Sequence, residues 1–211
     1  VFRPEAGEER EAFFDPGAFV IPRYYLTNPT CFQMMVSPEK LIMQIKRLSS
    51  DMGLFVPYVI TSSTIIDATP EQIWDFFYHI EDNYEKWHND HDFWHWTRGK
   101  PLEVGSKIDS QETVGGHKGG IKATVIESVR NKKIAIRPVW PLSFMCPRLE
   151  WIIEKKGDDT YFIARTHYSF GKIFLTLRKK SVAEILFLTQ KHMDEEGVNL
   201  KNILERKNTA L

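Results

Sequence analysis

The chain has 211 residues, of which 42% are hydrophobic, so it is long enough to bury a full core in one domain. Its 28 basic and 28 acidic side chains cancel, which argues against nucleic acid as a partner. The two cysteines, Cys31 and Cys146, form neither a CxxC motif nor a disulfide framework, which suits a reducing compartment. The apolar runs are too short to cross a bilayer, so we expect a cytoplasmic protein without membrane insertion.

Residues 1–57 are predicted to form an N-terminal extension with one helix. Ser37 is a suitable N-cap, Pro38 suits the first helical position, and Gly53 would end the helix. Its apolar stripe consists of Leu41, Ile45, Leu48 and Met52. We expect this stripe to pack on the main domain, although a homodimer contact or a membrane surface would also bury it.

Residues 58–211 are predicted to form the main domain. It begins with a β-branched run at 58–67, which predicts a strand. Thr69 can then act as an N-cap, Pro70 suits the first turn of a helix, and Gln72 completes a capping box. The domain therefore opens with a strand that leads directly into a helix.

The rest of the main domain alternates apolar elements with turn signals. The first helix is expected to run through Trp74 and Phe77, and a second, shorter one to carry Tyr84 and Trp87. The further elements are strands at 106–114, 121–129, 133–139, 149–155 and 161–170 and a long helix at about 177–206. This order predicts an α+β fold in which a curved antiparallel sheet wraps around the long C-terminal helix.

His192 and Glu196 lie four residues apart in the predicted long helix. This spacing places both side chains on one helix face, one turn apart. An imidazole and a carboxylate in this arrangement can bind one metal ion from one wall of a site. Two ligands do not make a site, and the same pair is also common on solvated helices, so a metal centre needs partners from elsewhere in the chain.

A glutamate in the strand at 106–114 is a candidate partner. One face of this strand is wholly polar, whereas the other carries Ile108, Glu112 and Val114 and is predicted to face inward. A carboxylate between apolar side chains on a concave face is costly unless a metal, an arginine or a protonated partner meets it. If the strand instead lies at the edge of the sheet, Glu112 reaches solvent.

Residues 84–96 contain three of the seven histidines among several aromatic side chains. Clustered histidines between a helix and a strand can supply a neutral nitrogen ligand and a nearby proton carrier. If this segment is extended, His91, Phe93 and His95 share one side. We expect His95 to be a packed ring hydrogen-bonded to a carbonyl group, and we favour functional roles for His88 and His91.

Three other features have more than one interpretation. The glycine-rich run at 115–120 lacks the spacing of a phosphate loop and is interpreted as a hairpin loop. The apolar segment at 140–147 is either a lid at a cavity mouth or a packed connection. Gly197 lies on the apolar stripe of the long helix, where it would allow a close approach to a neighbour or leave room for a ligand.

The order of elements and the run IDATPEQIWDFF at 66–77 resemble the START-like, or Bet v 1-like, helix-grip superfamily (SRPBCC). The resemblance covers about residues 58–207. It implies a deep cavity between sheet and helix that holds an apolar or aromatic molecule, and by itself it does not imply an enzyme.

Three motifs together resemble a more particular family: WHNDH at 87–91, the inward Glu112 followed by two glycines, and HMDEEG at 192–197. They are similar to motifs of the zinc-dependent carbon–carbon hydrolases typified by diacetylphloroglucinol hydrolase and phloretin hydrolase. The resemblance implies a Zn²⁺ site formed by one early histidine, one strand glutamate and a His-x-x-x-Glu pair. These roles fall on His88 or His91, on Glu112, on His192 and on Glu196.

The same resemblance implies a hydrolase that removes an acyl group from a phenolic or polyketide-like ring. A metal-activated water would attack the carbonyl group, and whichever of His88 and His91 does not bind metal would pass a proton to the ring. Tyr84 is the candidate for holding a phenolic oxygen. Two alternatives are a non-catalytic carrier of an apolar or aromatic small molecule and a metal-free enzyme similar to polyketide cyclases.

Overall fold

The computed structural model describes residues 54–209, so the helix predicted between Ser37 and Gly53 lies outside the described residues. The strands are β1 (Phe55–Ile66), β2 (His91–Arg98), β3 (Lys107–Val114), β4 (His117–Val129), β5 (Lys133–Pro138), β6 (Arg148–Lys156) and β7 (Asp159–Gly171). The helices are α2 (Pro70–Tyr78), α3 (Ile80–Trp87), α4 (Leu142–Met145), α5 (Lys172–Leu177) and α6 (Lys179–Thr209).

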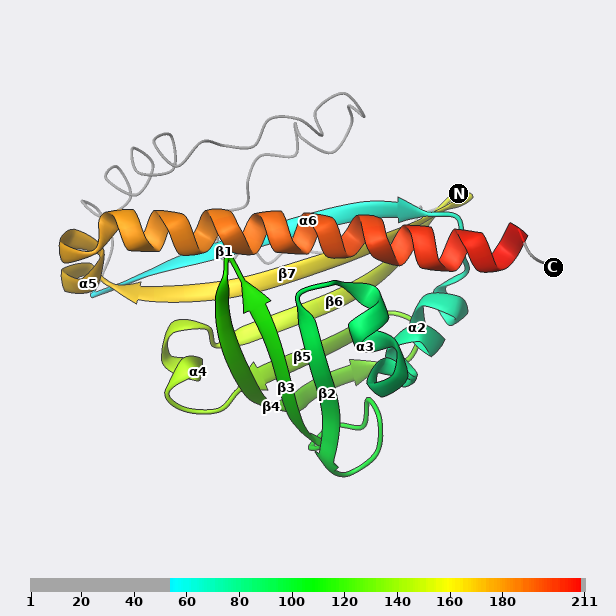
Figure 1. Cartoon of the computed structure of the whole chain (residues 1–211), viewed down its shortest axis with the longest axis horizontal. Coiled ribbons are helices and arrows are strands. Elements are labelled where there is room, and N and C mark those ends of the chain that lie inside the picture. The colour runs from blue at the N-terminus through cyan, green and yellow to red at the C-terminus, as the bar shows by residue number, and fades with distance from the viewer. Residues whose placement is uncertain (1–53, 210–211) are drawn as a thin grey trace, which may run out of the picture.

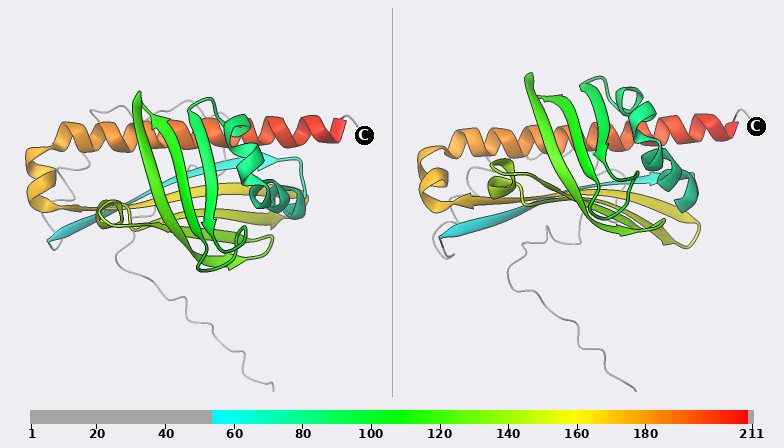
Figure 2. Two further views of the ribbon diagram at one scale, coloured as in Figure 1. Left: turned by 60° about the horizontal axis from the view of Figure 1, so that its bottom comes forward. Right: turned by 90° about the horizontal axis from the view of Figure 1, so that it is seen from below.

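The seven strands form one antiparallel sheet in the order β1-β7-β6-β5-β4-β3-β2. The sheet curves around α6, which lies along β1 and β7 and passes β2 and β3 (Figure 1). Helices α2 and α3 lie at one end of this arrangement and α4 and α5 at the other (Figure 2). The predicted α+β fold, with a curved antiparallel sheet around a long C-terminal helix, is confirmed.

The elements differ from the expectation at several places: β2 and α4 were not among the predicted strands and helices, and β1 begins earlier, at Phe55. β4 begins at His117, so the predicted glycine-rich loop is reduced to a turn at Gly115 and Gly116, both of which have positive φ. α5 was not expected, because its six residues are too few to show a helical period. The capping box of α2 is present as predicted, since the Thr69 hydroxyl accepts from the Gln72 N–H and the Gln72 side chain accepts from the Thr69 N–H.

The core lies between the concave face of the sheet and the buried stripe of α6. Burying such apolar side chains contributes about 1.5–3 kcal/mol each, which is the main stabilising term in a domain of this size. Trp87 of α3 is fully buried and packs against Phe77 of α2 and Trp151 of β6. The stripe of α6 consists of Val182, Leu186, Met193, Leu200 and Leu204, all of which are buried.

Two glycines allow α6 to approach the sheet. A Cβ atom at Gly197 would lie 2.3 Å from Oγ1 of Thr64 on β1, and one at Gly115 would lie 2.4 Å from Cδ1 of Leu188. Both separations are shorter than any real Cβ contact. Of the two interpretations of Gly197, the structure therefore supports close approach, and the carboxylate of the neighbouring Glu196 is brought towards the sheet.

We expect Gly197→Ala to destabilise the protein although alanine favours a helix. The gain in helix propensity is about 1 kcal/mol, whereas overpacking against Thr64 costs about 1–3 kcal/mol. Denaturant unfolding of the single variants and of the Gly197→Ala/Thr64→Ala double variant measures the coupling. Thr64→Ala should relieve the clash, with a coupling energy of about 1 kcal/mol, and additive effects would contradict this packing.

Candidate metal centre

Two pairs of side chains meet between the sheet and α6. His91 and Glu112 are directly opposite each other in the β2–β3 ladder, and His192 and Glu196 are one turn apart on α6. β3 is flanked by β2 and β4, so it is not an edge strand and Glu112 is not directed to solvent there. His91, His192 and Glu196 are buried, and the Glu112 side chain is 20% exposed.

Four atoms of these side chains converge between the sheet and α6. Nε2 of His91 lies 3.3 Å from Nε2 of His192, 3.2 Å from Oε1 of Glu196 and 3.9 Å from Oε2 of Glu112. Nε2 of His192 lies 3.7 Å from the same Glu196 oxygen and 3.9 Å from the same Glu112 oxygen. A tetrahedral zinc ion with bonds of about 2.05 Å separates its ligand atoms by about 3.3 Å, so these spacings fit such an ion.

The hydrogen bond of Nδ1 leaves the inward nitrogen of the neutral His91 ring unprotonated. Nδ1 of His91 lies 3.0 Å from the carbonyl oxygen of Tyr84, and because a carbonyl group only accepts, Nδ1 carries the proton. Burial lowers the pKa of His91, which favours the neutral ring. The neutral ring then presents an unprotonated Nε2 towards Glu112, His192 and Glu196, as a metal ligand must.

His88 has the opposite arrangement. Its Nδ1 accepts a hydrogen bond from the Asp90 N–H at 3.1 Å, so the neutral ring carries its proton on Nε2, which lies 3.4 Å from Oε2 of Glu195. Nitrogen atoms of His88, His91 and His192 also lie within 4.8 Å of one another, so the three histidines form a second possible ligand set. The tautomer therefore favours His91 over His88 as the ligand that the sequence left open.

The electrostatics of the two carboxylates make a cation favourable here. Burial raises the pKa of Glu112, and the nearby Glu196 raises it further. Burial also raises the pKa of Glu196. Among residues 54–206, no lysine or arginine forms an ion pair with either carboxylate. Two carboxylates and two neutral imidazoles form a donor set of charge −2, which a divalent ion such as Zn²⁺ would balance.

Two aromatic residues of α3 hold this set in place. The Tyr84 hydroxyl donates to Oε2 of Glu112 at 2.9 Å, and its ring is stacked on His91 with 3.9 Å between centroids. Burial raises the pKa of Tyr84, as does the negative charge of Glu112, so the phenol stays protonated. Nε1 of Trp87 donates to the carbonyl oxygen of Glu196 at 2.9 Å and ties α3 to α6. The expected role of Tyr84 as a holder of a phenolic oxygen is not tested by this contact.

Two expectations for residues 91–96 were wrong. The register of β2 shifts between His91 and Phe93, so His91 and Trp94 are both buried and Phe93 does not share the side of His91. The His95 side chain is 66% exposed rather than packed, lies 3.6 Å from Glu81 and stacks on Phe93. A bulge of one residue reverses the alternation beyond it, and strict period-two reasoning cannot foresee that.

An aromatic wall lies on the concave faces of β1 and β7, and we did not predict it as part of a site. It consists of Tyr58, Tyr168 and Phe170; the Tyr168 and Phe170 rings are stacked with centroids 5.5 Å apart. The charge of Glu112 contributes to the raised pKa of Tyr168 and of Cys146, which places both within its electrostatic range. The alternation of aromatic residues at 58 and at 168 and 170 was the available signal.

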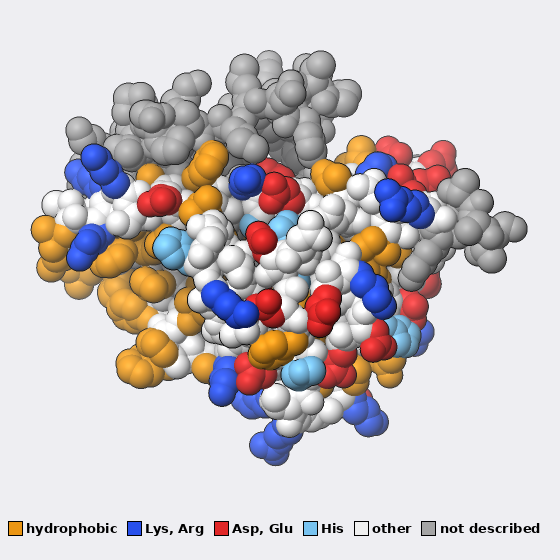
Figure 3. All heavy atoms as spheres, viewed as in Figure 1, with side chains coloured by type: hydrophobic (Ala, Val, Ile, Leu, Met, Phe, Trp, Pro, Cys, Tyr) orange, Lys and Arg blue, Asp and Glu red, His pale blue; other side chains and the backbone are white. Residues whose placement is uncertain are grey.

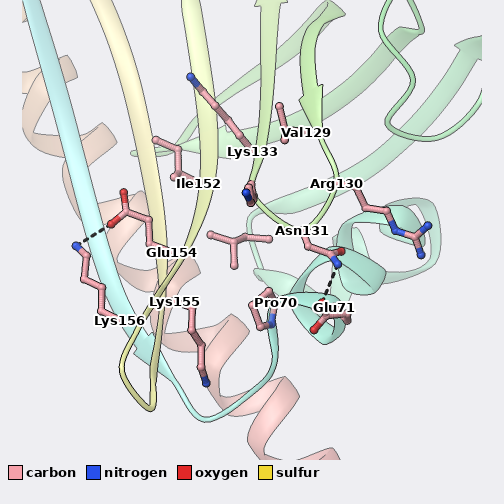
Figure 4. A pocket seen from close by; sticks show the side chains of 12 residues that line it. Pro70, Glu71, Val129, Arg130, Asn131, Lys133, Ile152, Glu154, Lys155 and Lys156 are labelled. Atoms are coloured by element: carbon pink, nitrogen blue, oxygen red, sulfur yellow. Dashed lines mark hydrogen bonds and ion pairs between the residues drawn. The ribbon is translucent and has the colours of Figure 1, made fainter. Parts of the chain in front are cut away.

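Two hollows of the surface lie away from this centre. One, of about 780 Å³, lies between the N-terminus of α2 and the β4–β5 and β6–β7 turns, where Asn131 donates to Glu71 (Figure 4). A second, of about 730 Å³, is lined by residues of α2 and of the loop at 100–104. Neither contains a histidine of the four-atom set, so size alone does not locate the chemistry, and we follow the convergence of the donor atoms.

No family model and no curated protein matches the chain, whereas solved structures do. Zhui aromatase/cyclase from Streptomyces sp. R1128 matches with a TM-score of 0.55 at 12% identity, over 72% of this chain and 95% of that one. Norcoclaurine synthase of Thalictrum flavum, a point mutant in complex with a transition-state analogue, matches with a TM-score of 0.57 at 12% identity over 74% and 99%. Major latex-like protein 151 of Panax ginseng gives 0.51 at 15% identity over 70% and 99%.

These similarities show the fold, a curved antiparallel sheet around a long C-terminal helix, which is the helix-grip arrangement. At such identities they show the fold alone, and they give no support for the hydrolase family. Among the described residues, no helix has both the length and the hydropathy needed to span a bilayer.

We expect the metal-free protein to be stabilised at alkaline pH by Glu112→Gln. Burial raises the folded-state pKa of Glu112 above its unfolded value of about 4.3, so the folded state binds more protons. This contribution is therefore present at low pH and is lost as the pH rises through the raised pKa. The other titrating groups are the same in the wild type and in Glu112→Gln, so their contributions largely cancel in the difference between the two free energies of unfolding.

Urea unfolding in the presence of a chelator, at pH 5 and pH 8, measures this effect. The free energy of unfolding of Glu112→Gln should increase relative to that of the wild type as the pH rises. Glu103→Gln changes an exposed position, so its free energy of unfolding should differ little from that of the wild type at either pH. If the metal-free wild type instead became more stable relative to Glu112→Gln between pH 5 and pH 8, the electrostatic account would be contradicted.

Proposed function

We propose that the protein is a zinc-dependent hydrolase whose metal ligands are His91, Glu112, His192 and Glu196. The observation that carries the proposal is that Nε2 of His91 and Nε2 of His192 lie 3.3 Å apart and each lies 3.2–3.9 Å from oxygens of Glu112 and Glu196, between β2, β3 and α6. The raised pKa of both buried carboxylates supports it, because a divalent cation would favour their charged forms.

The proposed reaction is hydrolysis of the bond between an acyl group and a phenolic or polyketide-like ring. One water molecule is consumed, its hydrogen being added to the ring carbon and its hydroxyl to the acyl carbon, so the products are the deacylated ring and a carboxylic acid. With four protein ligands, a bound zinc ion would need a fifth position for water, and it would then lower the pKa of that water to about 7 and polarise a carbonyl group. The aromatic wall of Tyr58, Tyr168 and Phe170 would pack against such a ring.

In this proposal His88 transfers the proton. It is not one of the four ligands, and its ring lies 4.4 Å from that of His192, so it borders the centre. Glu195 lies on one side of it and the Asp90 N–H on the other, and these contacts orient the ring. Tyr84 orients Glu112 by its hydrogen bond and would also border the substrate.

A metal-free function is the second candidate, and the named structural neighbours favour it. They include an aromatase/cyclase and norcoclaurine synthase, and neither is named as a hydrolase or a metal-dependent enzyme. The chain would then be a polyketide cyclase-like enzyme or a non-catalytic carrier of an aromatic molecule. Bound metal separates the two candidates, because the metal-free one requires no ion between His91 and Glu196.

The purified protein should contain about one zinc ion per chain, as measured by elemental mass spectrometry. His91→Ala should lose the zinc, because it removes a ligand. His88→Ala should keep the zinc but release acid from an acylphenol about 100-fold or more slowly, because it removes proton transfer. Loss of zinc from His88→Ala alone would reverse the assignment, and absence of zinc even after its addition to the metal-free protein would favour the second candidate.

We expect Tyr84→Phe to weaken zinc binding about 10- to 100-fold while the protein still binds one ion at saturation. The change removes the hydrogen bond to Oε2 of Glu112 but leaves the ring stacked on His91. Competition with a chromophoric chelator measures the affinity. Tyr78→Phe, at an exposed position on α2, is the matched control, and equal affinities of the two variants would contradict the role of Tyr84.

A further inference from the structure

An exposed apolar surface lies at the end of the molecule formed by α4 and α5. We call it the apolar rim and define it by residues 54–55, 139–145 and 173–177. Nine large hydrophobic side chains of these three segments are exposed, and Leu54, Trp140, Ile173 and Leu177 are exposed by 76–83%. Hydrophobic side chains gather over this end of the molecule (Figure 3). Such a continuous apolar surface is unusual for a protein that stays alone in water.

The three segments of the apolar rim are in contact with one another. The Lys172 N–H donates to the carbonyl oxygen of Leu54 at 3.0 Å, which joins the start of β1 to α5. The rings of Phe55 and Phe144 meet edge to face with 5.5 Å between centroids, which joins β1 to α4. The rim is therefore one surface built from segments that are far apart in the sequence.

Positive charge borders the apolar rim. The run at 171–183 contains Lys172, Arg178, Lys179 and Lys180 and no acidic residue, and the run at 139–147 contains no charged residue. The complete chain has a formal charge of zero, so this end is positive relative to the rest. Exposed apolar and aromatic side chains beside cations form the pattern of surfaces that bind at a lipid–water interface.

We propose that the apolar rim docks on the surface of a bilayer that contains anionic lipids. Trp140, Ile173 and Leu177 would enter the interfacial region, and the cations of the α5–α6 junction would face the lipid head groups. A second copy of the chain is a poorer occupant, because a two-fold contact would place the four cations of one copy near the same four of the other. The apolar rim is therefore better suited to an anionic lipid surface than to contact with a second copy of the chain.

The apolar rim is continuous with the aromatic wall. Phe174 of α5 is stacked on Phe170 with 6.2 Å between centroids, and Phe170 is stacked on Tyr168. A docked protein would therefore have its aromatic wall next to the bilayer, in which apolar aromatic molecules dissolve. The docking does not depend on the metal centre and would serve a hydrolase or a carrier equally.

The test is co-sedimentation of the full chain with vesicles of phosphatidylcholine alone and of phosphatidylcholine with 30% phosphatidylglycerol. We expect binding to the anionic vesicles that weakens with added salt. Ile173→Ser/Leu177→Ser and Lys179→Glu/Lys180→Glu should each lower the partition coefficient by at least about tenfold. All four residues lie at the surface, and unchanged circular dichroism and zinc content would show that the fold is kept.

Matched controls place equal changes elsewhere. Val104→Ser removes another exposed apolar side chain, and Lys155→Glu/Lys156→Glu reverses two charges at the β6–β7 turn. Neither should change vesicle binding by more than about twofold. Absence of binding by the wild type, an equal loss in the controls, or a dimer in sedimentation velocity that only the rim variants dissolve would overturn the proposal.

Discussion

Two carboxylates that share one buried position are the constraint on which the rest of this site depends. Glu112 comes from the sheet and Glu196 from α6, and the negative charge of Glu196 adds to the effect of burial in raising the pKa of Glu112. A protein can keep such a pair by protonating one member or by providing a positive charge between them. Burial drives the imidazoles of His91 and His192 towards the neutral form, so they do not supply that charge, and a metal ion is the source in our proposal.

The precision of the site comes from how closely the sheet and α6 approach. Gly197 allows contact with Thr64, the turn at Gly115 meets Leu188, and the Trp87 side chain hydrogen-bonds to the backbone of Glu196. These contacts fix the height of α6 above β2 and β3. The helix-grip fold leaves the chemistry to such local details, which is why a shared fold with cyclases and a synthase does not decide between a metal centre and a metal-free pocket.

Much of the fold could be predicted because local signals agree with tertiary packing. The Thr69 capping box, the inward face of β3 that carries Glu112, and the buried stripe of α6 were all read from residue spacing. The spacing of His192 and Glu196 placed both on one face of a helix for the same reason.

The choice between His88 and His91 could not be made from the sequence. It depends on the bulge in β2, on the Tyr84 carbonyl that accepts from one ring, and on the Asp90 N–H that donates to the other. The apolar rim also could not be predicted, because its three segments come together only when β1 pairs with β7 and α4 folds against them. Tertiary hydrogen bonds and long-range pairing leave no periodic signal in the chain.

The central claim is that one zinc ion lies among Nε2 of His91, Oε2 of Glu112, Nε2 of His192 and Oε1 of Glu196. Diffraction from crystals of the purified protein, recorded on both sides of the zinc absorption edge, tests it most directly. The account predicts one strong anomalous peak about 2.0–2.2 Å from each of these four atoms. A peak bound by His88 in place of His91, or none in crystals grown with zinc, would contradict it.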